Sequence, residues 1–576
     1  MTWRLSVLGI LLAMAAAQAV PAAEPTPRGQ AGGAAEKPWN FVFVLIDDLG
    51  WADLGCYGNT FHETPNIDRL AKQGMRFTDA YAACPVCSPT RASILTGKYP
   101  ATLNLTDFIP GHRRPWAKLV VPTFHQQLPP DEVTIAEMLR PHGYVSGSFG
   151  KWHLGGPEHY PNKQGFDEFV VTGGRHFYPR FRTTPKLDLK EGDYLADVLT
   201  DRAERFIRDH KDQPFFLYLS HYAVHIPLEA RPQRIKKYEA KRSMAKHRSK
   251  VMVRFVWPGA SADEVEKLLV RMEGRLRGDE AIASLVSKAT RTKSGEGRGV
   301  VAIEFDKPLP PEEMKRRVDK RLEFLKLPET AARPTVEVQP VNNPIYAAMV
   351  EHADQSVGRL TRVLDELGIA ESTVFIFFSD NGGLSQRFDK TGPIVCSNAP
   401  LRDEKGSLYE GGIRVPMIVR WPGVAKTGAT CSTPVSSVDL WPTIRAIAAT
   451  RAAKANATDA KAKVDGESLI PLLTQTGRLG RDAIYWHYPH YHHTTPAGAI
   501  RSGKYKLIEY FEDGRRELYD LTADPSETND LAARMPEMAR RLQARLSAWR
   551  QRVGAKPPTP NPDFDAAKAD AWRKKA

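Results

Sequence analysis

The sequence contains little cysteine for its length. Five cysteines occur among 576 residues, and an odd number cannot all pair within one chain. This scarcity excludes a fold that depends on a dense disulfide framework. A bridge between Cys396 and Cys431 and free buried thiols at both positions remain open, because sequence alone does not give connectivity. The cysteines are Cys56, Cys84, Cys87, Cys396 and Cys431.

Long apolar runs are also scarce, and the only candidate lies near the N-terminus. It covers the 16 residues 5–20, follows Arg4 and ends before a short stretch of small residues. A bilayer-spanning helix needs about 20 apolar residues, so this run predicts a signal peptide over residues 1–23, with an uncleaved anchor as the alternative. No cysteine follows the run closely, which argues against a lipoprotein. We therefore expect a periplasmic or secreted protein with no membrane span after signal removal.

Acidic residues are fewer than basic ones, which gives a formal net charge of +14. The excess is local: residues 231–250 hold nine Lys or Arg against one Glu, and residues 251–340 hold 17 basic against 15 acidic residues. Ten of the 14 net charges therefore lie in one stretch. Because this stretch has no interleaved aromatic pattern and no known nucleic-acid-binding module, we expect no nucleic-acid partner. The pattern favours a solvated linker over 231–250.

Two apolar runs are each followed by oxygen-bearing side chains. Residues 41–46 and 373–378 are typical of buried strands in a parallel sheet. In α/β folds, the chemistry takes place at the carboxyl ends of such strands. Three carboxylates and an amide oxygen suit Ca²⁺, whereas Zn²⁺ favours nitrogen or sulfur ligands. The candidate metal ligands are Asp47, Asp48, Asp380 and Asn381.

A pentapeptide of the form C-x-P-x-R runs from Cys87 to Arg91 and continues as A-S-I-L-T-G. Alone it is a weak signal, because such a pentapeptide occurs by chance in unrelated chains. Four further strings accompany it, and their order is informative. They are G-K-W-H-L-G from 150, S-H-Y-A-V-H-I-P from 220, L-R-D-E-K-G from 401 and Y-E-G-G-I-R-V-P from 409.

In sequence and order, these five motifs resemble those of type I, formylglycine-dependent sulfatases of the alkaline phosphatase superfamily. The resemblance covers roughly residues 38–230 and 342–530. It implies an α/β fold with a large mixed, mostly parallel sheet sandwiched by helices, and a smaller C-terminal antiparallel sheet domain. We expect the catalytic domain over 38–230 and 342–450, the C-terminal subdomain over 465–555 and a tail over 556–576.

The resemblance also implies a role for each motif residue. A maturation enzyme would convert Cys87 to formylglycine, whose hydrate attacks sulfur to give a covalent sulfated enzyme while Ca²⁺ lowers the hydroxyl pKa. Arg91 would hold the hydrate. His153 would take the proton from the second hydroxyl, so that sulfate leaves and the aldehyde returns. Lys405 or His225 would protonate the leaving oxygen. The residues expected to contact the sulfuryl group are Lys151, Lys405 and His225.

The remaining histidines divide into three groups. His225 is preferred to His221 because it directly precedes Ile226-Pro227. The string W-H-Y-P-H-Y-H-H over 486–493 predicts a cluster that lines a sugar-binding cleft, with adventitious metal binding as the alternative. Histidines without a motif are expected to be structural or at the surface: His62, His112, His125, His142 and His159.

Residues 231–341 interrupt the family pattern. After the basic linker, alternating apolar residues and a capping box of Ser261 with Glu264 predict the β-α-β-β-α-β order of a ferredoxin-like α+β module. The string V-W-P-G-A-S-A-D-E-V-E resembles a periplasmic porter subdomain of RND efflux transporters, although the membrane helices of those transporters are missing. A docking or assembly module and a tolerated surface insertion are equally open.

The sequence thus predicts an exported hydrolase of organic sulfate esters. A sulfated carbohydrate is favoured over a steroid or aryl ester, because aromatic and histidine-rich loops suit sugars. One alternative is a two-metal phosphatase or phosphodiesterase of the same superfamily, which needs a Ser or Thr nucleophile and a histidine where Asn381 stands. A second is a non-catalytic glycan-binding protein in which Cys87 is never converted.

Overall fold

The structure is a computed structural model. The predicted signal peptide and most of the second helix expected in the insertion lie outside its described residues. The residues described are 37–244, 249–257, 260–278, 286–294, 298–305, 317–318, 320–323, 335–340, 342–385, 394–451 and 463–568.

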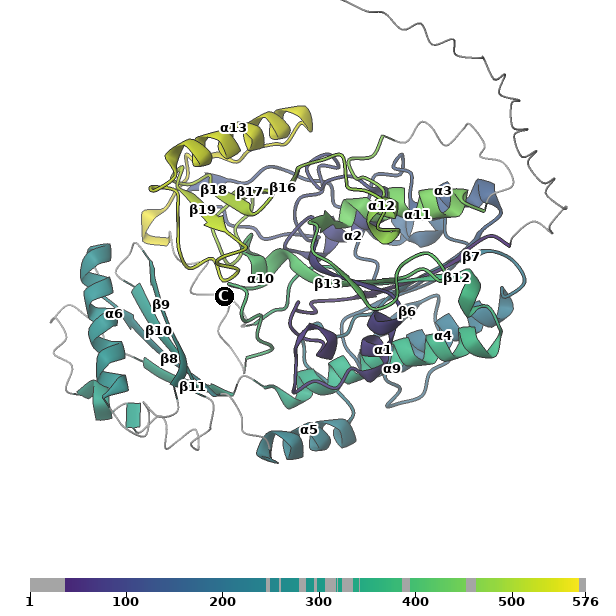
Figure 1. The fold of residues 1–576 in the computed structure, drawn as a ribbon, viewed down its shortest axis with the longest axis horizontal. Helices are drawn as coiled ribbons and strands as arrows, with labels where there is room; N and C mark the ends of the chain where they lie inside the picture. Colours follow the sequence, from purple (N-terminus) through teal and green to yellow (C-terminus); the bar gives the residue numbers. More distant parts are fainter. Residues whose placement is uncertain are drawn as a thin grey trace, which may run out of the picture. The chain divides into compact units, whose positions relative to one another are not determined.

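A ten-stranded mixed sheet forms the centre of the molecule (Figure 1). Its order is β14-β2-β13-β12-β1-β7-β4-β5-β6, and β15 pairs with β2. The neighbours β12, β1, β7 and β4 are all parallel, whereas β13 and β6 are antiparallel to their partners. The predicted fold class is therefore confirmed. The strands are β1 (Asn40–Ile46), β2 (Met75–Tyr81), β4 (Val145–Gly150), β5 (Glu168–Gly173), β6 (Arg182–Thr184), β7 (Phe215–Ser220), β12 (Thr373–Ser379), β13 (Arg414–Arg420), β14 (Ala429–Cys431) and β15 (Val435–Ser436).

Helices cover both faces of this sheet, which explains why β1 is apolar from Phe41 to Ile46 (Figure 1). Side chains of a strand alternate between faces. Val42 and Val44 pack with α1 (Pro65–Gln73), α4 (Leu195–Asp209) and α9 (Pro344–Glu366). Phe41 and Phe43 pack on the other side with α2 (Cys87–Thr96), α3 (Ile135–Leu139) and α11 (Leu440–Ala449).

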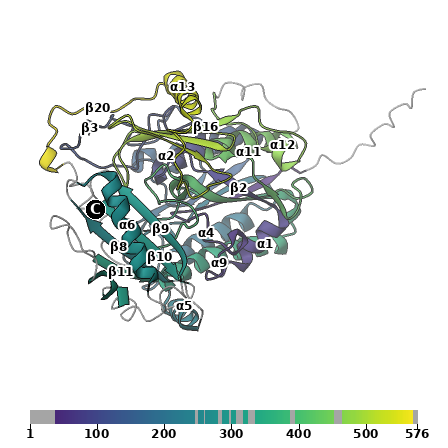
Figure 2. The ribbon, with the colours of Figure 1, turned by 60° about the vertical axis from the view of Figure 1, so that its left-hand side comes forward.

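A separate antiparallel sheet follows in the C-terminal part, in the order β16-β17-β18-β19. Helix α13 (Pro536–Arg552) packs on it through Leu542, Leu546 and Trp549. A short pair, β3 with β20, links residues 119–120 to residues 559–560 (Figure 2). The strands are β3 (Leu119–Val120), β16 (Ala483–Tyr488), β17 (Ala497–Ser502), β18 (Tyr505–Tyr510), β19 (Arg516–Asp520) and β20 (Thr559–Pro560).

The described part of the insertion forms a third, four-stranded antiparallel sheet in the order β11-β8-β10-β9. Numbered along the insertion, this order is fourth-first-third-second, the arrangement expected of a ferredoxin-like unit. The capping box of Ser261 with Glu264 begins α6 as predicted. The elements are β8 (Ser249–Val256), α6 (Ala262–Arg277), β9 (Val286–Ser294), β10 (Arg298–Phe305) and β11 (Thr335–Pro340).

The linker predicted over 231–250 is wrong for most of its length. Residues Pro232–Met244 form helix α5, and the Tyr238 side chain is fully buried. The Lys237 ammonium group lies 2.6 Å from Glu63 and 2.8 Å from Glu351. The basic run is therefore compensated by carboxylates from distant parts of the chain, which a local count of charges does not reveal.

Two expectations concern cysteines and membranes. All five cysteines lie in described segments and are free thiols, so Cys396 and Cys431 form no bridge. Within the described ranges, none of the helices combines the length and the apolar character that crossing a bilayer requires.

Candidate active site

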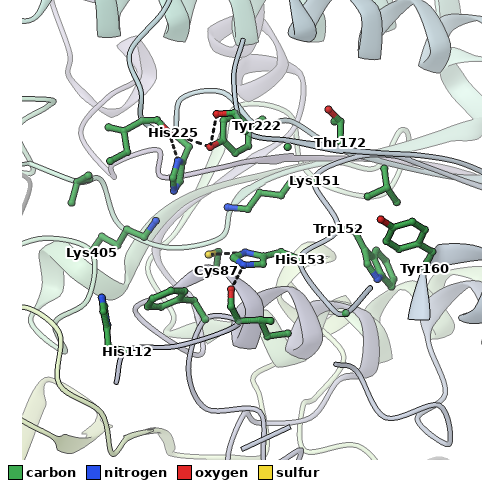
Figure 3. Close-up of a pocket in the computed structure, with 18 of the residues that line it drawn as sticks. Cys87, His112, Lys151, Trp152, His153, Tyr160, Thr172, Tyr222, His225 and Lys405 are labelled. Carbon is green, nitrogen blue, oxygen red and sulfur yellow. Dashed lines mark hydrogen bonds between the residues drawn. The ribbon is translucent and has the colours of Figure 1, made fainter. Parts of the chain in front are cut away.

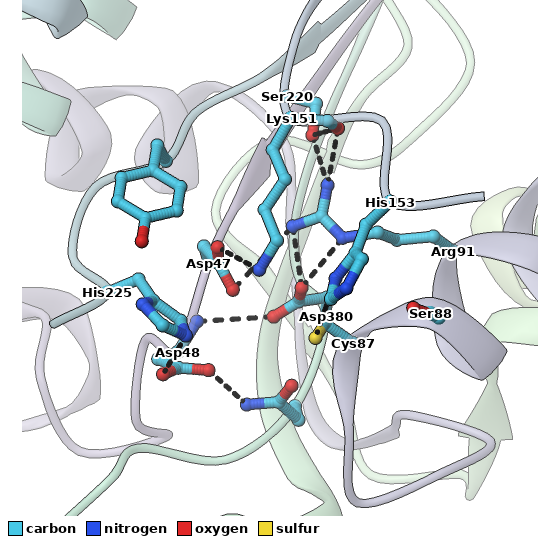
Figure 4. Close-up of polar contacts among 12 residues, drawn as sticks. Asp47, Asp48, Cys87, Ser88, Arg91, Lys151, His153, Ser220, His225 and Asp380 are labelled. Carbon is cyan, nitrogen blue, oxygen red and sulfur yellow. Dashed lines mark hydrogen bonds and ion pairs between the residues drawn. The ribbon is translucent and has the colours of Figure 1, made fainter. Parts of the chain in front are cut away.

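Four neighbouring parallel strands, β12, β1, β7 and β4, deliver polar side chains to one edge of the central sheet. Asp47 and Asp48 follow β1, and Asp380 follows β12. The Asp47 amide donates to the Ala223 carbonyl at 3.0 Å, which ties the loop after β7 to the end of β1. The structure brings every predicted site residue to this edge. Figure 4 shows Asp47, Asp48, Cys87, Arg91, Lys151, His153, His225 and Asp380. Asn381 and Lys405 lie beside them and both donate hydrogen bonds to Asp48.

Cys87 is the first residue of α2, so its thiol lies at the electropositive end of a helix. Its Sγ is 3.3 Å from Nδ1 of His153. Nε2 of His153 is 2.7 Å from the Ile109 carbonyl, which can only accept, so Nε2 carries a proton and Nδ1 faces the Cys87 sulfur. Burial opposes ionisation, but Lys151, His153 and Lys405 lower the pKa of Cys87 to about 7. The site therefore favours a negative charge at position 87.

Arg91 is fully buried and organises the site from behind Cys87. Its Nε and Nη2 donate to Oδ2 of Asp380 at 3.0 and 2.6 Å. Its Nη1 donates to the Lys151 carbonyl at 2.8 Å and also contacts the Ser220 hydroxyl. One guanidinium thus connects the ends of β12, β4 and β7 to the helix that carries Cys87.

Two buried lysines face the acidic end of the sheet. Nζ of Lys151 lies 2.6 Å from Asp47, and Nζ of Lys405 lies 2.6 Å from Asp48. Burial opposes their charge, but Asp47 raises the pKa of Lys151 and Asp48 raises that of Lys405. Burial also opposes ionisation of Asp47, yet Lys151 and His225 lower its pKa to about 2. The lysines are therefore cations and the carboxylates anions at neutral pH.

The donor set at this edge fits a divalent cation. Oδ1 of Asp47 and Oδ1 of Asn381 are buried and, among the described residues, have no hydrogen-bond partner. Such oxygens are costly unless something binds them. Carboxylate and amide oxygens are ligands that Ca²⁺ accepts. His225 also lies here, 3.6 Å from Asp48, and ligand atoms of Asp47, Asp48 and His225 come within 4.8 Å of one another.

Sequence comparison places this geometry in a family. The profile of the Sulfatase family matches residues 39–449, which cover the central sheet and every residue of the site. The chain belongs to the sulfatase family. As a sulfatase, the protein is a hydrolase of sulfuric esters. A second profile, N-sulphoglucosamine sulphohydrolase, C-terminal, matches residues 403–552.

Several curated sulfatases are similar along most of the chain. Human arylsulfatase A is 30% identical over 535 residues, which span 86% of this chain and 79% of the relative. The steryl-sulfatase of Mus musculus is 31% identical over 507 residues, 83% of this chain and 72% of the relative. The N-acetylglucosamine-6-O-sulfatase of Bacteroides thetaiotaomicron is 26% identical over 536 residues, 85% of this chain and 82% of the relative.

A solved structure supports the fold. The structure of Ps i-CgsB in complex with k-i-k-neocarrahexaose superposes with a TM-score of 0.62 at 24% identity, covering 94% of this chain and 98% of that chain. This likeness concerns the path of the backbone. It accounts for the central sheet with its helices and the separate antiparallel sheet that follows.

The sulfatase site opens into a cavity of about 530 Å³ (Figure 3). Its polar lining includes the two lysines and Cys87, His153 and His225. The rest is largely aromatic or aliphatic and comes from several loops. This combination holds an anionic group at one end and leaves room for a larger organic group beside it. The aromatic and aliphatic lining residues are Phe108, Ile109, Trp152, Tyr160, Val171, Tyr222, Ile226 and Leu384.

The histidine predictions have mixed outcomes. His225 lines the cavity, whereas His221 is buried outside it with Nε2 2.8 Å from the Ser356 hydroxyl. From the cluster 486–493, only His492 lines the cavity. His490 instead lies 2.8 Å from the Thr106 hydroxyl. His112, expected to be structural or at the surface, also lines the cavity. No local motif marks it, because its loop is positioned by long-range contacts such as that of Ile109 with His153.

Proposed function

We propose that this sulfatase cleaves sulfate esters with a formylglycine at position 87 and a bound Ca²⁺ ion. The observation that carries the proposal is the placement of Cys87 between the His153 imidazole and two lysine cations, beside buried oxygens that lack a hydrogen-bond partner. An anionic, poorly electrophilic sulfuryl group needs this combination of nucleophile and fixed positive charge.

Asp47, Asp48, Asp380 and Asn381 would hold the cation. When bound, it supplies Lewis-acid neutralisation of sulfuryl oxygen charge and promotes ionisation of a nearby hydroxyl. Arg91 fixes the Asp380 carboxylate through two hydrogen bonds, so this ligand is oriented before any ion arrives. We also propose that the same Arg91 guanidinium contacts the hydrated formylglycine at position 87.

The remaining side chains position the ester and move protons. The formylglycine at position 87 supplies, in hydrated form, a hydroxyl nucleophile and a second hydroxyl that can be deprotonated. Nδ1 of His153 takes that proton, because its Nε2–H is already committed to the Ile109 carbonyl. Lys151, Lys405 and His225 contact the sulfuryl oxygens, and Lys405 or His225 protonates the leaving oxygen.

We propose a sulfated carbohydrate as the substrate class. The matching C-terminal profile is named for an enzyme of a sulfated amino sugar, and one relative is an N-acetylglucosamine-6-O-sulfatase. The cavity offers aromatic faces and imidazoles, which suit sugar rings and hydroxyls. We further propose that the protein is exported to the periplasm or secreted. A maturation enzyme would convert Cys87 to formylglycine. The insertion over 231–341 would serve docking or assembly.

Mass spectrometry tests the central part of the proposal. Trypsin should release residues 77–91 from protein coexpressed with a formylglycine-generating enzyme. We expect this peptide to have lost H₂S and gained oxygen, and the same preparation to release sulfate from 4-nitrophenyl sulfate and from sulfated mono- or oligosaccharides. An unmodified thiol in a preparation that releases sulfate would overturn the formylglycine assignment. A converted residue with no sulfate release would overturn the reaction.

A two-metal phosphatase is less well supported. Among the residues that the structure describes, a single group of acidic and histidine side chains has metal-binding spacing. Asn381 follows Asp380 where the two-metal alternative needs a histidine, and its Oδ1 is available as an oxygen ligand.

A further inference from the structure

Two histidines from separate parts of the chain form one side of the cavity next to Lys405. His112 comes from the loop after β2 and α2, and His492 comes from the connection between β16 and β17. Their ring centroids are 5.2 Å apart, and Phe108 packs edge-on against His112 at 4.8 Å. Figure 3 shows His112 beside Lys405 and on the opposite side of Cys87 from Trp152. We call His112 and His492 the histidine pair.

The position of His492 is fixed by the backbone next to Lys405. A Cβ atom at Gly406 would collide with the imidazole of His492, so the ring packs directly on the glycine. The Gly406 amide donates to the Pro85 carbonyl at 2.9 Å, two residues before Cys87. Through Gly406, the position of His492 is therefore linked to those of Lys405 and Cys87. This link exists although His492 belongs to the C-terminal sheet domain.

Burial keeps the histidine pair neutral. It lowers the pKa of His112 to about 4 and that of His492 well below the ordinary value, and neighbouring positive groups act in the same direction. A neutral imidazole has one N–H donor and one nitrogen acceptor. A hydroxyl group also donates and accepts, whereas a flat hydrocarbon does neither. The pair thus suits an alcohol-rich group better than an aromatic or steroid ring.

We infer that His112 and His492 determine leaving-group specificity by hydrogen bonding hydroxyl groups of a sugar that carries the sulfate. The inference rests on the proposed function and deepens it, because it assigns the carbohydrate preference to two named side chains. Sulfate is held by the lysines, and the ring that bears it lies against the histidine pair. Aryl sulfates enter the same cavity but gain nothing from these imidazoles.

The test compares two substrates on three variants. His112→Phe and His492→Phe keep the ring size and remove both polar atoms, and His125→Phe is the matched control because His125 is exposed and outside the cavity. For each protein, kcat/KM is measured with the best sulfated monosaccharide and with 4-nitrophenyl sulfate. We expect the ratio of sugar to aryl kcat/KM to fall about tenfold in both cavity variants and to stay constant in the control.

A second measurement does not depend on a mutated fold. The wild type is assayed with deoxy analogues of the sugar that lack one hydroxyl each, and at least one should lose about tenfold in kcat/KM. That loss should shrink in the histidine variants. Equal losses on both substrates, or no effect of any deoxy analogue, would overturn the inference while leaving sulfatase activity intact. A wild type that cleaves only aryl sulfates would also overturn it. Converted protein that cleaves neither substrate would instead defeat the proposed function and this inference with it.

Discussion

Among the described residues of this sulfatase, two clusters of buried charge invite comparison, because they differ in how completely their polar atoms are hydrogen bonded. The site cluster consists of Asp47, Asp48, Asp380, Arg91, Lys151 and Lys405, and it borders the cavity. The closed cluster joins the central sheet to the C-terminal sheet. It consists of Asp79, Tyr81, Glu410, Arg414, Arg501, Lys506 and Glu527.

The closed cluster is saturated with partners. Lys506 lies between Glu410 at 2.9 Å and Glu527 at 2.8 Å, and Glu527 also accepts from the Glu410 amide. In the site cluster, one oxygen of Asp47 and one of Asn381 lack a hydrogen-bond partner among the described residues. Burial of charge alone therefore does not indicate function in this protein. Oxygens without a hydrogen-bond partner distinguish the cluster that can bind something further.

The largest expected effect follows from replacing the proposed nucleophile. Cys87→Ala should reduce sulfate release by at least about 10⁴-fold, because an alanine side chain can neither be converted to formylglycine nor attack sulfur. Cys84→Ala is the matched control, since Cys84 is also buried but lies outside the cavity lining. Initial rates with 4-nitrophenyl sulfate check both. Comparable activity in the two variants would contradict the role of position 87.

Removing a candidate metal ligand should have the next largest effect. Asp380→Asn should lower kcat/KM by roughly 10²–10³-fold and abolish stabilisation by Ca²⁺. In the wild type, Ca²⁺ at about 100 times its Kd should raise the free energy of unfolding by about 2.7 kcal/mol. Thermal melts with chelator and then with added Ca²⁺ measure this. Glu527→Gln, in the closed cluster, should keep the full Ca²⁺ response, and equal loss in both variants would erase the distinction between the clusters.

The closed cluster should show its effect in stability. Lys506→Met leaves the carboxylates of Glu410 and Glu527 buried without their shared cation, which should cost about 3–5 kcal/mol. Lys504→Met, two residues earlier and exposed, should cost at most about 1 kcal/mol. Urea unfolding of the three proteins gives both values. Similar urea midpoints for the two variants would show that Lys506 does not stabilise the fold through its buried ion pairs.

The smallest expected effect is a pH dependence. Burial raises the pKa of Glu527 to about 7, although Lys506 opposes the rise. Because this value exceeds that of the unfolded chain, the stabilising contribution is complete below about pH 4.5 and is lost as the pH rises through 7. Between pH 6 and 8, the wild type should lose roughly 1 kcal/mol relative to Glu527→Gln. Urea unfolding at both pH values measures the free energy of unfolding of the wild type, of Glu527→Gln and of Glu537→Gln, an exposed control. The same pH dependence in all three proteins would contradict the prediction.

Most of the fold could be predicted because its strands are buried on both faces. The apolar runs 41–46 and 373–378 became β1 and β12 within one residue, since a parallel strand between two helix layers is apolar throughout. Helix α5 was missed since the acids that neutralise it come from elsewhere in the chain.

The site was predictable only where motifs are local. Asp47, Lys151 and Asp380 directly follow strands, and Cys87 begins α2, so short local motifs could indicate them. His112 and the pairing of Lys506 with two glutamates depend on contacts between residues far apart in sequence. A short stretch of sequence does not reveal which distant residues will contact it in the fold.

The contact of His492 with Gly406 has a consequence for redesign of the cavity. A methyl group at position 406 would occupy space that the His492 imidazole fills. Such a substitution therefore requires a residue much smaller than histidine at position 492. Conversely, a small residue at 492 exposes the backbone beside Lys405 to solvent. Broadening the enzyme toward bulkier esters therefore calls for paired substitutions, with each increase in bulk at one position matched by a reduction at the other.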